Sequence, residues 1–405
     1  MASLDLTSFD AALKVHYTDD EVERLTYNDH PLLALLMKDE KFKGKNLPIP
    51  IIYGNIAGRS AAFATAQTNS GPTQIEDFVL TRAKDYAVAS IDGETMDAAE
   101  DDADAFMDAA TTEFDSAFEA ISSSLATSLY RNGTGSIGQV SAGSTVSAQV
   151  ITLANPEDSV AFEVGMVLRG TSTDGGAYDT GQEILAGIDR DTGVLTATSA
   201  AWNTVMTDLA ASDYLLTSGD LNAKVKGLDA WMPSSVTSTA FFGVDRTADS
   251  VRLGGARYDS TTNGENIEEA LINGAVRAGR HGGRVTHYFM SMERWGDLGK
   301  ILGSKREYVQ VHATAEVNFP AYEVQGPKGL IKVIADQDCQ PNIAWGLDMR
   351  CWKFYSLKKC PRILQRDGNK LLRLSSADGD EFRVGYYGQL GGRAPGRNVR
   401  VTLPT

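Results

Sequence analysis

The chain has 405 residues, of which 42% are hydrophobic and 22% charged, so it can form two or three domains and is not a disordered polymer. No stretch approaches the roughly 20 consecutive apolar residues of a membrane-spanning helix, so we predict no membrane contact. The net charge of −15 argues against a dedicated nucleic-acid reader, because neutralising phosphates requires clustered Lys and Arg.

Residues 1–44 have the pattern of an arm with short helices. Thr18 and Glu21 have the spacing of a capping box, in which the two side chains satisfy free amides at the start of a helix. After Pro31, a short apolar run over residues 32–37 predicts a second helix. We therefore predict an N-terminal arm over residues 1–44.

Residues 45–90 predict a long β-hairpin. Pro48 and Pro50 exclude a helix at its start, because proline donates no amide and restricts the residue before it. Strand-forming residues return at 78–81 and 86–91, after a stretch rich in small and polar residues that predicts an irregular tip. An isolated hairpin is marginally stable in water. The hairpin therefore lies on a neighbouring subunit or on its own domain, and the sequence leaves both open.

Residues 91–133 predict the longest helix. Apolar side chains recur at steps of three and four residues from Met96 to Leu129, and no proline interrupts them. Asn132 and Gly133 supply the stop signal. The other face is almost wholly acidic, and we interpret it as a solvated face and not as a metal or acid–base site.

Residues 134–222 change to short apolar runs separated by turn signals, which is typical of a small all-β sandwich or barrel. This segment holds only two basic residues, so we predict an inserted β domain. The G-x-G-x-x-G string at 133–138 follows a helix and leads into β structure. Dinucleotide-binding folds have the opposite order, so we interpret the string as a linker.

Residues 223–405 predict a mixed α/β region. Helices are expected at 266–280 and 291–302. Strands are expected near 285–290, 331–335, 344–347, 351–357, 371–374, 382–387 and 398–403.

The chain contains none of the common catalytic strings. We find no G-x-x-x-x-G-K-[ST], H-E-x-x-H or G-x-S-x-G sequence. The His and Cys residues are scattered without metal-ligand spacing. We therefore predict no enzymatic activity, no catalytic residue, no cofactor and no metal.

Charge is distributed unevenly along the chain. The net charge is −13 over residues 1–133, −9 over 134–222, −1 over 223–349 and +8 over 350–405. One interpretation is solvated faces of mixed sign. The other is that the acidic N-terminal part of one copy meets the basic C-terminal part of another, since complementary patches steer association and fix register.

The order of these elements resembles the major capsid proteins of tailed bacteriophages, which have the Hong Kong 97 fold. Local phrases that carry the resemblance lie at 241–246, 252–255, 289–295, 326–336 and 380–390, and the similarity extends over most of residues 25–405. The resemblance implies an α+β Hong Kong 97-type capsid fold, from which the all-β insertion is a departure.

The resemblance also assigns each segment a place in that fold. The expected divisions are an arm at 1–44, an extended loop at 45–90, a spine helix of the peripheral domain at 91–133, the inserted β domain at 134–222, a mainly axial domain at 223–349, and return strands of the peripheral domain at 350–405.

The implied function is a structural subunit that assembles into hexamers and pentamers of an icosahedral head shell enclosing double-stranded DNA. Implied partners are further copies of the chain, a separate scaffolding protein, a portal and a decoration protein, with assembly in the bacterial cytoplasm and a final place in the virion. The expected contact residues between subunits are Pro48, Ile49, Ile51, Tyr53, Arg59, Phe63, Arg82, Lys84, Lys358, Lys359, Arg362, Arg366, Arg393 and Arg397.

Two other functions stay open from the sequence. One is a carbohydrate-active enzyme with a β accessory domain, acting through paired Asp or Glu residues. The other is a tail, fibre or adhesin-type binding module.

Overall fold

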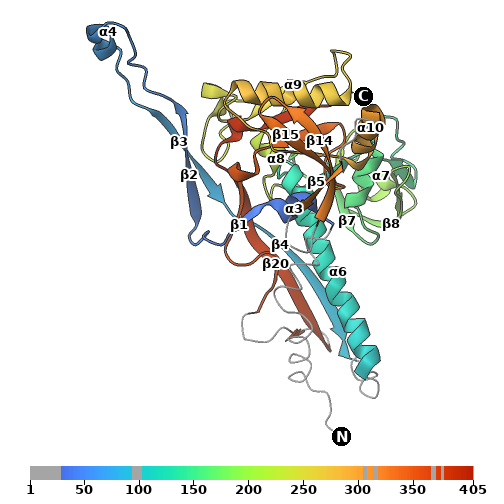
Figure 1. Cartoon of the computed structure of the whole chain (residues 1–405). Helices are drawn as coiled ribbons and strands as arrows, with labels where there is room; N and C mark the ends of the chain where they lie inside the picture. The colour runs from blue at the N-terminus through green and yellow to red at the C-terminus, as the bar shows by residue number, and fades with distance from the viewer. Residues whose placement is uncertain are drawn as a thin grey trace.

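The computed structural model describes residues 29–93, 103–303, 308–312, 318–365, 371–374 and 378–404. Most of the predicted arm and Arg366 lie outside these residues. The described part contains three sheets of six or seven strands, a long helix that lies along one of them, and a two-stranded hairpin that projects from the body (Figure 1). The predicted α+β class is confirmed.

The first sheet has six strands centred on the long strand β20, which pairs antiparallel with four others. Its strands are β1 (Met37–Asp39), β4 (Ala83–Asp92), β17 (Trp352–Ser356), β18 (Arg362–Ile363), β19 (Leu371–Arg373) and β20 (Gly379–Gly392). Helix α6 (Ala103–Tyr130) lies along β4 and β20, and the short helix α3 (Pro31–Leu35) packs near the C-terminal end of α6.

Helix α6 agrees with the periodicity of its sequence. Phe114 and Phe118 are buried and both contact Phe382 on β20, with ring centroids 4.2 and 5.9 Å apart. Strand β4 continues to Asp92, and Gly93, directly after it, is helical. Residues 94–102 lie outside the described part of the chain.

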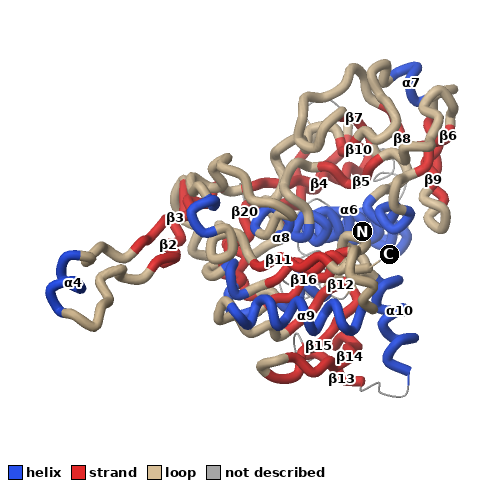
Figure 2. The backbone as a smooth tube through the Cα atoms, turned by 90° about the horizontal axis from the view of Figure 1, so that it is seen from above, coloured by secondary structure: helices blue, strands red, loops and turns tan. Residues whose placement is uncertain are grey.

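The second sheet has seven strands in the order β11-β21-β16-β12-β15-β14-β13. Its strands are β11 (Ala256–Asp259), β12 (His287–Met290), β13 (Tyr308–His312), β14 (Asn318–Gly326), β15 (Gly329–Ala335), β16 (Ile343–Leu347) and β21 (Val399–Thr402). Helix α9 (Ile267–Arg280) runs along one face of this sheet, with α10 (Met292–Leu302) beside it (Figures 1 and 2). Asn266 and Glu269 form a capping box at the start of α9, as the predicted helix start requires.

The third sheet lies within the predicted insertion and has its own core. Its strands are β5 (Ser136–Gln139), β6 (Val150–Thr152), β7 (Val167–Thr171), β8 (Glu183–Asp189), β9 (Val194–Ala197) and β10 (Tyr214–Thr217), with the short helices η1 (Pro156–Ala161) and α7 (Trp202–Val205). Phe162, Leu185 and Trp202 are buried in this core. The amide of Asn222 donates to the carbonyl of Thr134 over 2.8 Å, so the chain enters and leaves the insertion at adjacent points.

The segment after the insertion packs against the first sheet and α6. It includes α8 (Leu228–Trp231) and η2 (Arg246–Asp249), and Trp231 and Val244 lie in the same core as Phe114. The last strand, β21, pairs with β11 and β16, so it belongs to the seven-stranded sheet and not to the sheet of the other C-terminal strands.

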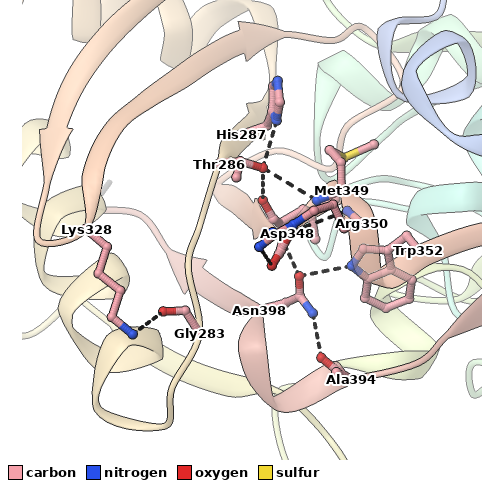
Figure 3. Close-up of polar contacts among 11 residues, drawn as sticks. Gly283, Thr286, His287, Lys328, Asp348, Met349, Arg350, Trp352, Ala394 and Asn398 are labelled. Atoms are coloured by element: carbon pink, nitrogen blue, oxygen red, sulfur yellow. Dashed lines mark hydrogen bonds and ion pairs between the residues drawn. The ribbon is translucent and has the colours of Figure 1, made fainter.

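A buried asparagine holds the junction of these two sheets, between the short helices η4 (Met349–Cys351) and η5 (Pro395–Arg397) (Figure 3). The side-chain oxygen Oδ1 of Asn398 accepts from the backbone amide of Asp348 over 2.7 Å and from the indole of Trp352 over 3.0 Å. The carboxylate of Asp348 in turn accepts two hydrogen bonds from the guanidinium of Arg350 and one from its backbone amide. These bonds satisfy the polar groups where the chain passes between sheets.

Candidate assembly surfaces

The projecting hairpin consists of β2 (Asn46–Gly54) and β3 (Gln74–Thr81), with the short helix α4 (Phe63–Thr68) between them (Figure 1). The predicted hairpin is therefore present, but its second strand ends at Thr81. The strand at 83–92 was predicted to belong to the hairpin and instead pairs with β20. We call residues 46–51 and 78–81 the hairpin base, and residues 52–77 the hairpin tip.

The hairpin base is packed into the body of its own chain. Ile49, Ile51, Phe78 and Leu80 alternate along the two strands and are all buried, and the ring of Phe78 lies 5.1 Å from that of Trp231. Ile49 and Ile51, two of the predicted contact residues, therefore face the chain's own core, because period-two alternation turns both side chains inward.

The hairpin tip has no buried residue, and all of its residues are described. Phe63 is 82% exposed, Ile56 64%, Ile52 62% and Ile75 53%. Covering such side chains contributes about 1–2 kcal/mol each. The tip therefore presents an apolar surface that its own chain leaves open. Only Phe63 of these four was among the predicted contact residues.

Other predicted contact residues of this region lie in mixed surroundings. Pro48, Arg59 and Lys84 are exposed, Lys84 on β4 and not on the hairpin. Tyr53 is half-buried, and its carbonyl accepts a hydrogen bond from Arg252. Arg82 is also half-buried. Its guanidinium donates to the carbonyl of Phe42 over 3.0 Å and lies 5.2 Å from the centre of the Phe42 ring.

The predicted basic contact residues of the C-terminal region fall in two places. Lys358 and Lys359 are exposed after β17, and Arg362 is half-buried on β18. Arg393 and Arg397 are exposed at the junction of the two sheets, beside η5.

A groove runs between α6 and the insertion. It encloses a cavity of about 790 Å³, lined mainly by small residues of α6 and by Val160, Val164 and Met166 of the insertion. At one end the Lys224 ammonium forms an ion pair with Asp85 on β4 and a second, 3.1 Å long, with Asp220. Arg131 bonds to Asp158 over 2.5 Å at the C-terminal end of α6. These pairs fix the insertion to the body.

A buried polar cluster lies where the described chain begins, next to α3. His30 bonds to Asp338 over 2.6 Å, and the Tyr130 hydroxyl donates to Asp336 over 2.6 Å. Burial and the charge of Asp338 raise the pKa of Asp336 to about 7. Burial lowers the pKa of His30, but the hydrogen bond and charge of Asp338 outweigh burial and raise it overall. Local sequence gave no partner for His30, because Asp338 is distant in the chain.

Comparison with known proteins gives a fold and no sequence family. The sequence matches no protein-family model and no curated protein. In contrast, the capsid asymmetric unit of cyanophage A-1(L) aligns with a TM-score of 0.51 at 14% identity, over 93% of both chains. The chain has the Hong Kong 97 capsid fold.

Two further solved structures match this capsid fold less closely. The capsid of a native GTA particle aligns with a TM-score of 0.47 at 9% identity, over 92% of this chain and 90% of that one. A structure from Mycobacterium phage Ogopogo aligns with a TM-score of 0.42 at 11% identity, over 92% of each chain.

Among the described residues, no helix is long and apolar enough to span a membrane, and no three His, Cys, Asp or Glu side chains are grouped to hold a metal ion.

Proposed function

We propose that this chain is a major capsid protein whose copies assemble into the shell of a tailed-phage head. The observation that carries the proposal is the hairpin tip. It projects from the body, its four large apolar side chains are exposed, and α4 has only six residues. A two-stranded hairpin and so short a helix are marginal in water, so a second copy is the natural support.

The finer proposal follows the capsid fold. Copies form hexamers and pentamers of an icosahedral shell around double-stranded DNA, with a separate scaffolding protein, a portal and a decoration protein as partners. Assembly takes place in the bacterial cytoplasm and the product is the virion. The tip lies on a neighbouring subunit, and the exposed predicted residues Pro48, Arg59, Phe63 and Lys84 contribute to contacts between copies.

The domain roles belong to the same proposal. Helix α6 is the spine of a peripheral domain that includes β4 and β20, and the seven-stranded sheet with α9 is the axial domain at the centre of a capsomer. The insertion, with its own sheet and core, is an addition to this plan.

An enzyme acting through paired carboxylates is less well supported. Glu157 lies near Glu293 on α10, and burial followed by the neighbouring charge of Glu293 raises the pKa of Glu157 to about 7. The cavity beside Glu157 holds about 10 Å³, which is roughly the space of one water molecule. A sugar ring does not fit there, so this carboxyl pair serves as a contact between the insertion and α10.

Negative-stain electron microscopy and sedimentation velocity of the purified chain test the proposal. Under assembly conditions, with a scaffolding protein added where it is required, the wild type is expected to form closed shells. Phe63→Asp places a charge in the proposed contact, so its assembly is expected to stop at capsomers or monomers. The matched control is Val205→Asp, at another exposed apolar position, on the insertion. A wild type that stays monomeric under all these conditions would refute the function.

A further inference from the structure

A cavity of about 450 Å³ lies beside α8, between the C-terminal end of α6 and the segment that follows the insertion. Such a volume falls within the roughly 300–1,000 Å³ typical of ligand pockets. Lys226, Arg246 and Arg400 line it, and Asp229 is the one acidic residue in the lining. These side chains give the cavity walls a net charge of +2, in a chain whose net charge is −15.

The cations of this cavity are poorly compensated. Asp229 lies 3.3 Å from Arg400 and neutralises that guanidinium. Among the described residues, no carboxylate forms an ion pair with Lys226 or Arg246. The Lys226 ammonium instead lies 4.7 Å from the ring centre of Phe242, and the Arg246 guanidinium 4.2 Å from that of Phe241. A cation is stabilised less by an aromatic face than by a carboxylate. Partly burying a cation without a counter-ion costs folding free energy.

Two of the guanidinium groups also have unused donors. Arg246 is 7% exposed, and its Nη1 donates to the carbonyls of Ala230 and Trp231. Its buried Nε has no acceptor among the described residues, and the same holds for the Nε of Arg400. Buried donors are almost always satisfied in proteins, so the residues that line this cavity include donors that the described chain leaves unused.

The electrostatics of the cluster agree with this geometry. Burial and the nearby charge of Arg246 lower the pKa of Lys226. Burial and the charge of Arg257 lower the pKa of Arg246 to about 10. Arg257 lies just behind the wall, where its guanidinium donates to the carbonyl of Pro233. A bound anion would relieve this repulsion.

We propose that this cavity is an oxyanion-binding site, which takes a phosphate or carboxylate group between Lys226, Arg246 and Arg400. Oxyanions are the acceptors that guanidinium and ammonium donors bind best. The strongly acidic surface of the whole chain disfavours a long polyanion such as DNA, so the ligand is a small anion or a single carboxylate group.

Isothermal titration calorimetry of the full-length chain tests this site, with inorganic phosphate in one arm and acetate in the other. Sodium chloride holds the ionic strength constant. Lys226→Gln is the test variant, because, of the groups of Lys226, only the backbone amide forms a hydrogen bond within the described part of the chain, to Gln389. Arg246 is less suitable, since it donates to two buried carbonyls. Lys300→Gln is the control, since it removes an equal charge from exposed α10, outside the cavity.

We expect saturable binding of phosphate or acetate to the wild type and to Lys300→Gln, and at least tenfold weaker binding to Lys226→Gln. The arm that binds more tightly identifies the ligand class. No saturable binding in either arm, or equal binding by Lys226→Gln, would overturn the proposal. Binding of double-stranded DNA without a response to either small anion would also overturn it.

A second measurement uses the wild type alone and guards against a misfolded variant. Amine labelling followed by mass spectrometry compares Lys226 with Lys300. The bound anion is expected to slow labelling at Lys226 and leave Lys300 unchanged, and equal rates with and without anion would contradict the site. Neither experiment depends on shell formation, so failure here and failure of the capsid proposal are distinguishable.

Discussion

The base and the tip of the hairpin are continuous along two strands, yet the base packs within its own subunit and the tip is exposed. Phe78 and Leu80 in the base are fully buried in the core of their own chain. Ile56 and Phe63 in the tip are more than 60% exposed. Hydrophobic residues of the base therefore stabilise the subunit, while those of the tip remain available for a second copy. The difference shows that apolar composition alone does not separate folding contacts from assembly contacts.

The largest expected effect is a loss of subunit stability on truncation in the base. Phe78→Ala removes a fully buried ring that contacts Trp231 and Phe241, and it should lower the free energy of unfolding by about 3–5 kcal/mol. Urea denaturation of the unassembled chain measures this value. A loss below about 1 kcal/mol would show that the base is not part of the core.

A pH effect is expected from the buried cluster beside α3. The pKa of Asp336 is raised to about 7 in the folded chain, so the folded state holds a proton that the unfolded state has released. The pKa of His30 is also raised in the folded chain. At pH values above the ordinary pKa of histidine, His30 therefore contributes to the same fall in the free energy of unfolding. The free energy of unfolding should therefore fall as pH rises from about 4 to above 7, by about 1 kcal/mol or more.

Asp336→Asn is the matched test of this pH effect, because it keeps the size of the side chain and removes its titration. The variant should show a flatter dependence of unfolding free energy on pH than the wild type. Equal slopes for the two proteins would exclude Asp336 as the titrating group.

A smaller stability effect is expected at the end of the base. Arg82→Ala removes the charged hydrogen bond to Phe42 and the contact with its ring, at a loss of about 1–3 kcal/mol. Arg59→Ala, at an exposed position in the tip, is the control and should change unfolding by less than about 0.5 kcal/mol. Similar losses of unfolding free energy in Arg82→Ala and Arg59→Ala would contradict the distinction between base and tip.

The smallest effect on folding is expected at the tip. Phe63→Asp should change the unfolding free energy of the unassembled chain by less than about 0.5 kcal/mol, because the side chain is 82% exposed. Thermal denaturation of the dissociated chain measures this change. A large loss of stability would mean that Phe63 packs within its own subunit.

Sequence patterns predicted the elements whose signals are local. The helix predicted at 266–280 matches α9, and the apolar periodicity predicted the long α6. The sequence did not show that the strand after Arg82 leaves the hairpin, because its partner β20 lies about 300 residues later in the chain. Likewise, alternation groups Ile49 with Ile51, but only the fold shows which face of β2 meets the core.

The candidate surfaces could be predicted only in part. Phe63 was among the predicted contact residues and is exposed, whereas Ile52, Ile56 and Ile75 are also exposed and were not among them. Isoleucine usually indicates a core position in a strand, as at Ile52 and Ile75. The oxyanion cavity could not be predicted, since Lys226, Arg246 and Arg400 come from three separate segments. These residues come together through the packing of α8 and β21, which no local sequence pattern predicts.

Electron cryo-microscopy of particles assembled from the purified chain tests the central claim most directly. We predict closed shells in which residues 52–77 of each copy lie on a second copy and Phe63 is buried between them. Particles in which the tip folds back on its own subunit, or stays in solvent, would contradict the account.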